Sequence, residues 1–425
     1  MKFGKYLLKS AFVAAVLVIG SLGTVAEADA RVDASIRPVQ LAVSGHTIWD
    51  GDAKNDLLIS SHTIVSLVGA GKDMGVEGLQ KALWDYSDKA IQLHHDIRTQ
   101  MIPQAMQDRD ERLKDGGTFF PTFESKHDVF IRRADTLATS LLEYSSSYEG
   151  GAHGMYGVWG RNFDSKTGKE LQLMDVFKDA NVLIGAIETQ LRRDYPNASF
   201  IEGTLMEEMV EKMVLDCSIP WTLDPTGVSF YFNPYLIGSY SEGIFTTTIL
   251  FDEYPGLFKE KYCRMPKSYC MELRPFLPVR TLFADGSGTA VKIGSTDNGL
   301  FVMANGSELA DSGEAYLSRP VLVSLADGRR YIYVDTLEAG DICQRTRVYN
   351  ITNGRPVAVP MQEWLTRRGD IPENYAQLKD DKDLDEIYYV MSNPEHFSMT
   401  KLDEGTGKAN QCYCSVGPNG APIIK

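Results

Sequence analysis

Four pairs of turn-forming residues divide the second half of the chain into short apolar segments. Asn or Asp followed by Gly readily takes the left-handed backbone angles of a tight hairpin loop, so such pairs favour antiparallel strands. They are Asp285-Gly286, Asn305-Gly306, Asp327-Gly328 and Asn353-Gly354. Helical patterns are scarce from Pro275 onward. We therefore expect a mainly β C-terminal domain at residues 276–425, either a sandwich or a barrel.

Residues 36–260 differ from this region because helical and strand patterns alternate there. Apolar side chains recur every three or four positions from Leu79 to Met101, as on one face of a helix, and Pro103 is expected to end or kink that helix. Shorter patterns predict strands at 57–68, 129–134, 136–144, 155–163, 228–232 and 244–251. They predict helices at 182–191, 205–215 and 254–262.

These patterns predict an α+β fold made of two packed sub-domains with antiparallel sheets and helices. The first is expected at residues 36–160 and the second at residues 161–260. The chain has 425 residues, which is long enough for this division because a domain takes roughly 150 residues.

The first 30 residues have the three parts of an export signal. The cationic start contains three lysines, Lys2, Lys5 and Lys9. An uncharged, mostly apolar stretch follows from Ser10 to Ala26, and Ala28-Asp29-Ala30 supplies the small residues of a signal peptidase site. We expect cleavage after Ala30 and export to the periplasm, the cell envelope or the medium. Cleavage after Ala28 and retention as an anchor are the alternatives, and a mature chain should have no transmembrane span.

The charge of the chain excludes some partners. Lys and Arg number 43 against 57 Asp and Glu, which gives a net charge of −14. Binding to nucleic acid depends on many contacts from Lys and Arg to phosphates, so we expect no nucleic-acid partner. An anionic membrane surface is disfavoured for the same reason.

All six cysteines follow the expected signal peptide, and an even number suits disulfides in an oxidising compartment. They are Cys217, Cys263, Cys270, Cys343, Cys412 and Cys414. Cys263 and Cys270 flank a short loop that could close as a local disulfide. Cys412 and Cys414 would project from one strand face, and their partners stay open. The spacing of zinc ligands is absent from the sequence, so disulfides or free thiols are favoured over a metal.

A glycine-rich stretch carries the best candidate for acid–base catalysis. His153 lies near Glu149 in the sequence and Asp164 follows, so a pair of His and carboxylate could transfer protons. In the favoured alternative, Gly150 and Gly151 make a turn in which His153 bonds locally. The sequence has no nucleophile elbow and no His-Glu-x-x-His motif, and its two apparent phosphate loops lack the Ser or Thr after Lys. We therefore expect no cofactor and no metal, and an enzyme is the less favoured class.

Several short motifs resemble one family of exported bacterial domains. The most specific is Tyr148-Glu149-Gly150-Gly151-Ala152-His153-Gly154, and others are Asn162-Phe163-Asp164, Thr167-Gly168-Lys169, Leu173-Met174-Asp175-Val176-Phe177 and the stretch 230–238. Over about residues 36–260 the chain resembles the RsiV-like exported domain of unknown function. This domain occurs in the anti-sigma factor RsiV and in the N-terminal part of the deacetylase PdaC. The resemblance implies an α+β fold that works at the cell envelope.

The resemblance also implies a function class, an exported cell-envelope binding protein that recognises a lysozyme-like cationic protein or a wall glycan such as peptidoglycan. The binding residues expected are Tyr148, Gly150, Gly151, His153, Pro234 and Tyr235. One alternative is a peptidoglycan-directed hydrolase or deacetylase, although the C-terminal region has no Thr-Phe-Asp-Asp-Gly metal motif. The other alternative is a structural envelope protein.

Overall fold

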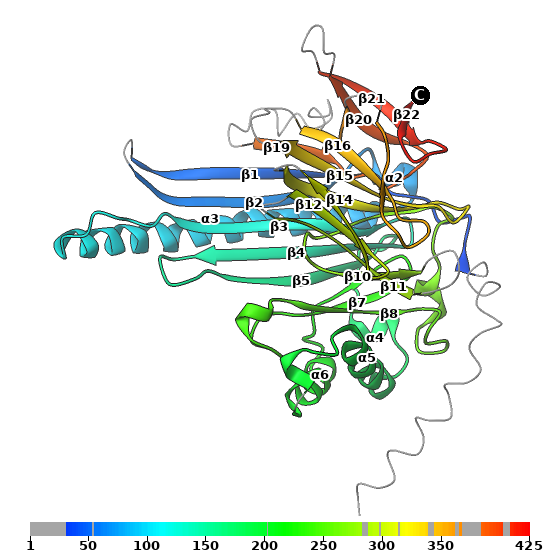
Figure 1. The fold of residues 1–425 in the computed structure, drawn as a ribbon, viewed down its shortest axis with the longest axis horizontal. Helices are drawn as coiled ribbons and strands as arrows, with labels where there is room; N and C mark the ends of the chain where they lie inside the picture. The colour runs from blue at the N-terminus through cyan, green and yellow to red at the C-terminus, as the bar shows by residue number, and fades with distance from the viewer. Residues whose placement is uncertain are drawn as a thin grey trace, which may run out of the picture.

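A computed structural model describes most of the chain after the expected signal peptide (Figure 1). The described residues are 31–52, 55–201, 203–282, 288–296, 299–312, 315–338, 344–361, 365–367, 384–402 and 409–425. The expected signal peptide at residues 1–30 and Cys343 lie outside these ranges.

A six-stranded sheet forms the N-terminal part of the fold, in the order β19-β1-β2-β3-β4-β5. Its strands are β1 (Leu41–Asp52), β2 (Asn55–Leu67), β3 (Phe123–Ala134), β4 (Ala138–Tyr148), β5 (Met155–Asp164) and β19 (Leu384–Tyr389). All neighbours are antiparallel except β2 and β3, which are parallel over only four residue pairs, from Leu58 with Phe123 to Ser61 with Lys126. A parallel pair needs a long crossover, and here α2 (Gly71–Met74) and α3 (Glu77–Lys114) provide it.

Helix α3 runs alongside the sheet and contacts it through two separate apolar clusters (Figure 1). Leu79 and Leu83 pack at one end, with strands β1 to β5. Met101 and Ala105 pack at the other end, with Leu58 and Phe123. In the middle of the predicted apolar stripe, Tyr86 packs against the first cluster, and Tyr86, Ala90 and Leu93 line an open space described below.

The helix does not end at Pro103, so an end there was wrong, and the alternative of a kink stays a prediction. Helix α3 extends to Lys114, and Pro103 lies inside it. A proline in a helix leaves the carbonyl four residues earlier without its usual N–H donor. Here that carbonyl belongs to Thr99, and both residues are exposed, so water can bond the carbonyl and the helix continues.

A smaller sheet with helices packs below the first sheet (Figure 1). Its strands β6 (Trp221–Leu223), β7 (Gly227–Phe232) and β8 (Phe245–Leu250) are antiparallel. Helices α4 (Leu173–Val176), α5 (Ala180–Asp194) and α6 (Leu205–Leu215) bury apolar faces against it. The single turns η1 (Ser199–Ile201), η2 (Tyr240–Glu242) and η3 (Glu260–Cys263) complete this part. The helix expected at 254–262 was wrong, because Pro255 and the left-handed Gly256 break the chain into turns.

Three antiparallel sheets form the mainly β C-terminal region, as expected. The central one has the order β17-β16-β15-β14-β9, and a four-stranded sheet covers each face through a separate apolar cluster. The first cover consists of β10 (Val279–Leu282), β11 (Gly288–Thr296), β12 (Gly299–Ala304) and β13 (Ser307–Ser312). The second consists of β18 (Leu365–Thr366), β20 (Phe397–Leu402), β21 (Ala409–Val416) and β22 (Pro422–Ile424). The central strands are β9 (Tyr269–Glu272), β14 (Ala315–Ser324), β15 (Arg330–Glu338), β16 (Gln344–Asn350) and β17 (Val357–Ala358).

Two strands connect the parts that the sequence suggested as separate. Strand β19, from the C-terminal region, pairs with β1. Strand β9, which precedes Pro275, pairs with β14. The predicted division into domains stays a prediction, since the first and last parts share a sheet.

The cysteines do not form the local disulfide that the loop between Cys263 and Cys270 suggested. Both are free thiols, and they lie in different apolar clusters, Cys263 beside the helices and Cys270 in the C-terminal β region. Burial raises the pKa of the Cys263 thiol to about 11. Cys412 and Cys414 do share one face of β21, with their Sγ atoms 4.0 Å apart. Their disulfide partners stay a prediction.

Candidate functional site

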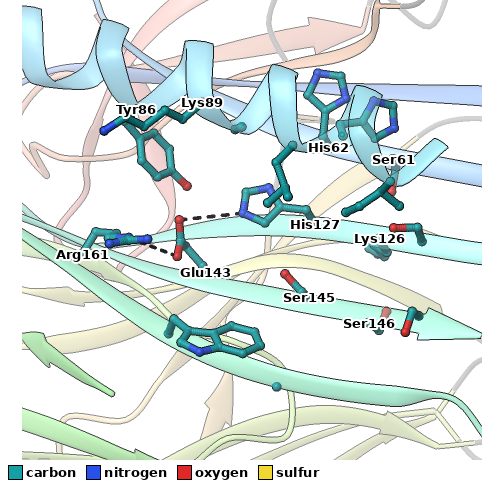
Figure 2. A pocket seen from close by; sticks show the side chains of 18 of the residues that line it. Ser61, His62, Tyr86, Lys89, Lys126, His127, Glu143, Ser145, Ser146 and Arg161 are labelled. Atoms are coloured by element: carbon teal, nitrogen blue, oxygen red, sulfur yellow. Dashed lines mark ion pairs between the residues drawn. The ribbon is translucent and has the colours of Figure 1, made fainter. Parts of the chain in front are cut away.

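A cleft of about 670 Å³ lies between helix α3 and strands β3 to β5 (Figure 2). Small residues on neighbouring strands create it. His127, Ser145 and Gly157 stand directly opposite one another across three strands, and Ser125 and Ser147 form the next row. Paired residues of antiparallel strands share one face, so this part of the sheet presents short side chains. Helix α3 contacts β1 and β2 along its length through Ser87, His94 and Arg98, but the short side chains of β3 to β5 leave a hollow beneath it.

A buried carboxylate occupies the middle of the cleft. Glu143 lies with Oε1 3.9 Å from Nε2 of His127 and Oε2 3.4 Å from Nε of Arg161 (Figure 2). Burial alone would raise the pKa of Glu143, but the contacts with His127 and Arg161 outweigh it and the pKa is lowered. Tyr86 faces this carboxylate from α3, and burial together with the Glu143 charge raises the pKa of Tyr86 well above its usual value. At neutral pH the group therefore holds an ionised Glu143 and a neutral Tyr86.

Histidines line the end of the cleft where β2 and β3 separate. His46 and His62 are opposite residues on β1 and β2, with ring centroids 5.0 Å apart, and the ring of His94 from α3 lies 4.2 Å from that of His62. Burial, together with the charge of nearby Arg98, lowers the pKa of His62 to about 3 and the pKa of His94 to about 4. Both imidazoles are therefore neutral at physiological pH.

Two atoms of this histidine group have no hydrogen-bond partner among the described residues. They are Nδ1 of His62 and Nε2 of His94, and both are buried. Buried polar atoms are nearly always paired, because an unpaired one costs about 1–3 kcal/mol. Both residues belong to the wall of the cleft.

The described residues offer no site for a resident metal ion. No three side chains of His, Cys, Asp or Glu within these ranges are placed to hold one. In the histidine group the rings stack face to face or tilt against one another, whereas a shared metal needs ring nitrogens that converge on one point. None of the helices in the described part of the chain has both the length and the apolar character to cross a membrane.

The structure separates Asp164 from His153, two of the three residues proposed for acid–base catalysis. His153 is exposed, stacks on Tyr240 at 4.1 Å and contacts the carbonyl of Gly154 through Nδ1. Glu149 accepts a hydrogen bond from Gln104 of α3. Asp164 lies at the far end of β5, where Lys261 and Thr167 donate to it. The ten residues of β5 span roughly 30 Å, so His153 and Asp164 cannot act together.

The residues proposed for binding meet only in part. His153 and Tyr235 come from distant segments, yet both pack on Tyr240, with 5.7 Å between the rings of Tyr235 and Tyr240. Tyr235 is 56% exposed. With Tyr156 at 5.4 Å from Tyr240 they form an aromatic patch, defined here as His153, Tyr156, Tyr235 and Tyr240. This patch adjoins the cleft, because Tyr156 also lines it.

The remaining proposed binding residues lie outside this aromatic patch, and they are Tyr148, Gly150, Gly151 and Pro234. Pro234 lines the cleft, and the preceding Asn233 holds the edge strand β5 through two hydrogen bonds to the backbone of Val158. Tyr148 ends β4. Gly150 has φ of +79° and Gly151 is exposed, so the two make a turn as the local interpretation of this stretch required.

Sequence reasoning missed most of the cleft. Glu143, Ser145 and Ser147 alternate along β4, and Trp159 and Arg161 alternate along β5, which is the period of one strand face. The run of serines in a predicted strand, with a tryptophan in the next one, was the available signal. The role of His62 and His94 could not be found this way, since they come together only through packing.

The fold and the cleft define an α+β protein in which one long helix bridges a mixed sheet. Residues 174–252 match the family model described as "Protein of unknown function (DUF3298)", so the chain contains a DUF3298 domain. Of the cleft residues, Asn233 and Pro234 fall inside the match. The resemblance is thus shown as far as a DUF3298 domain of unknown function at residues 174–252, and export, the wider span 36–260 and a specific relation to RsiV or PdaC stay predictions.

Two solved structures of DUF3298 proteins are similar to the chain. A member of the family from Bacteroides fragilis is 17% identical, with a TM-score of 0.36, and the match covers 52% of this chain and 96% of that one. A family protein from Pseudomonas aeruginosa is 16% identical, with a TM-score of 0.33, and the match covers 56% and 98%. A comparison with curated proteins gives no match.

Proposed function

We propose that this chain is an exported cell-envelope binding protein that holds a wall glycan in the cleft under α3. The observation that carries the proposal is Trp159, which lines the cleft and is 44% exposed beside a floor of serine and glycine. An aromatic face stacks on the apolar face of a sugar ring, and hydroxyl groups bond its substituents. The aromatic patch around Tyr240 extends this surface beyond the cleft.

Export is supported by the signal-like residues 1–30 and by the first residues after them. Arg31, which would begin the mature chain, pairs with Asp252 at 3.0 Å and donates to the carbonyl of Phe251. A mature chain starting at Arg31 would thus have an anchored N-terminus. Cell fractionation and N-terminal sequencing test export, and a product that stays in the cytoplasm with Met1 intact would contradict it.

Binding to purified, insoluble peptidoglycan tests the glycan proposal. The wild-type protein should sediment with the peptidoglycan, and Trp159→Ala should lose most of that binding because the stacking face is removed. Trp84→Ala is the matched control, since Trp84 is 58% exposed on α3 and does not line the cleft. If both variants sediment equally, the cleft is not the binding site. If the wild type does not sediment, peptidoglycan is not the ligand.

The second candidate partner is a lysozyme-like cationic protein, which the net charge of −14 favours. Binding should then be strong at low salt and weak at high salt, since attraction between exposed charges is screened. Measuring lysozyme affinity at two salt concentrations decides this. If the chain binds neither peptidoglycan nor lysozyme, the remaining alternative is a structural envelope protein. The hydrolase or deacetylase alternative stays a prediction, in which Glu149 rather than the distant Asp164 would be the partner of His153.

A further inference from the structure

We infer that the histidine end of the cleft is a subsite for an uncharged group bearing a hydroxyl or an amide, which His62 and His94 recognise by hydrogen bonds. The inference rests on the proposed function and names the part of the ligand that this end of the cleft binds. An acetamido group on a sugar ring has this chemistry.

The subsite exists because two strands separate. Strands β2 and β3 pair only as far as Ser61 and Lys126, and His62 is the next residue on β2. Beyond that point the backbone of β2 turns to α3 instead, where the Ser87 hydroxyl accepts from the N–H of Val65 and donates to its carbonyl. His62 therefore lies at the fork between β2, β3 and α3.

Each of the two imidazoles has a ring nitrogen without a hydrogen-bond partner among the described residues, and both side chains are buried. His62 is 7% exposed and His94 is 6% exposed. The unpartnered atoms are Nδ1 of His62 and Nε2 of His94, and both residues line the cleft. Leaving two such atoms unpaired side by side is costly unless a ligand or an ordered water bonds them.

The surroundings select an uncharged group. Both imidazoles are neutral, so neither offers a full charge to an ion. The charged side chains Arg98 and Asp50, which act on His94, bond one another through two contacts of 2.9 and 2.7 Å. Arg98 would repel a cationic group at this end, and either ion would lose its hydration between two rings that offer it no charge in return. A neutral hydroxyl or amide avoids both penalties.

Calorimetry with two defined oligosaccharides tests the subsite. The probes are the tetramer of N-acetylglucosamine, which is uncharged, and the tetramer of glucosamine, which carries ammonium groups. The wild type should bind the acetylated tetramer at least about tenfold more tightly than the cationic one. His62→Leu and His94→Gln should each weaken binding of the acetylated tetramer by about tenfold, the usual value of one hydrogen bond.

The matched control is His95→Gln, because His95 is adjacent on α3 but its side chain is 69% exposed. This variant should bind like the wild type. Thermal unfolding without ligand adds a second readout. A recognition role predicts that His62→Leu keeps or raises the melting temperature while affinity falls, since an unpaired buried atom has been removed.

The outcomes separate this inference from the proposed function. If the wild type binds neither tetramer nor peptidoglycan, the proposed function fails and the subsite with it. If the wild type binds the acetylated tetramer and both histidine variants bind equally well, the subsite is overturned while the proposed function stands. If the wild type binds the two tetramers with equal affinity, the claim that the subsite prefers an uncharged group is overturned. If His62→Leu does not fold, His94→Gln decides by the same criteria.

Discussion

Two buried polar groups in the same sheet differ in how their hydrogen bonds are satisfied. Arg132 of β3 is fully buried and bonds both carboxylate oxygens of Asp224 at 3.0 and 2.6 Å, and the carbonyl of Glu272 at 2.9 Å. His62 of β2 and His94 are nearly as buried, yet each has an unpartnered ring nitrogen within the described structure. The chain itself supplies the hydrogen-bond partners of Arg132, whereas the partners of His62 and His94 would come from a bound ligand.

The partners of Arg132 show what the first group does. Asp224 belongs to the turn before β7, and Glu272 of β9 bonds Arg319 of β14 through both oxygens and accepts from the N–H of Ile131. The network therefore fixes the N-terminal sheet to the smaller sheet and to the C-terminal β region. Burial works to lower the pKa of Arg132, but Asp224 outweighs it and the pKa is raised. The polar groups of this network are paired within the chain and join three parts of the fold, whereas His62 and His94 in the wall of the cleft each have an unpartnered ring nitrogen.

Breaking the Arg132 network should have the largest effect. Arg132→Met removes the cation and leaves Asp224 buried without compensation, so the free energy of unfolding should fall by about 3–5 kcal/mol. Urea unfolding measures it. Lys126→Met is the control on the same strand, because its pair with Asp128 is exposed and should contribute below about 1 kcal/mol. Similar losses in both variants would show that the network does not hold the parts together.

The histidine group should make stability depend on pH. An unfolded histidine takes up a proton near pH 6.5, whereas folded His62 and His94 stay neutral down to about pH 3 and 4. As the pH falls below 6.5 the unfolded state gains protons first, so the contribution is complete above that pH and is lost toward pH 3. Between pH 7 and 5 each histidine should lower the free energy of unfolding by on the order of 2 kcal/mol.

Urea unfolding of the wild type and His62→Leu at pH 7 and 5 measures this contribution. The variant should lose less stability between the two pH values than the wild type does. His95→Gln should follow the wild type, since its ring is exposed. An unchanged pH dependence in His62→Leu would mean that His62 is accessible to protons in the folded protein, and the comparison with Arg132 would then fail.

The two regions also differ in how far sequence could predict them. Local periodicity correctly predicted β2, β4 and β5, and it predicted α6 to the residue. Turn pairs correctly indicated the mainly β C-terminal region. Strand β19 pairs with β1 across more than three hundred residues, and no local pattern encodes such a contact. The same limit applies to Arg132 and Asp224, which are 92 residues apart.

For the cleft, the sequence predicted the helix that covers it but not which residues come together in space. The apolar stripe from Leu79 to Met101 correctly predicted a helix, and its central residues would be expected to pack on the sheet. Tyr86 packs against the sheet, but Ala90 and Leu93 line an open space, because small residues on β3 to β5 lie beneath them. His153 drew attention for its glycine-rich setting, whereas His127 lay in an ordinary strand. Its importance depends on Glu143, which only strand pairing brings near.

Substituting a buried serine of the Arg132 network should have an intermediate effect on the free energy of unfolding. Ser229 is fully buried and its hydroxyl donates to Asp224 at 2.6 Å. Ser229→Ala should lower the free energy of unfolding by about 1–2 kcal/mol, because a buried carboxylate loses a donor. Ser145→Ala, on the cleft floor, should change it by less than about 0.5 kcal/mol. Thermal or urea unfolding compares the two, and equal losses would show that the cleft serines are structural.

The smallest effect on stability is expected where the cleft is filled. Ser145 faces the hollow between the strands and α3 (Figure 2), so Ser145→Leu adds volume where no chain atoms need to move. Enlarging a residue in a packed core typically costs 1–3 kcal/mol, but here the free energy of unfolding should change by less than about 0.5 kcal/mol. Peptidoglycan binding should nevertheless fall, because the leucine occupies the space of the ligand. A large loss of stability would show that the cleft is closed in solution, and unchanged binding would place the ligand elsewhere.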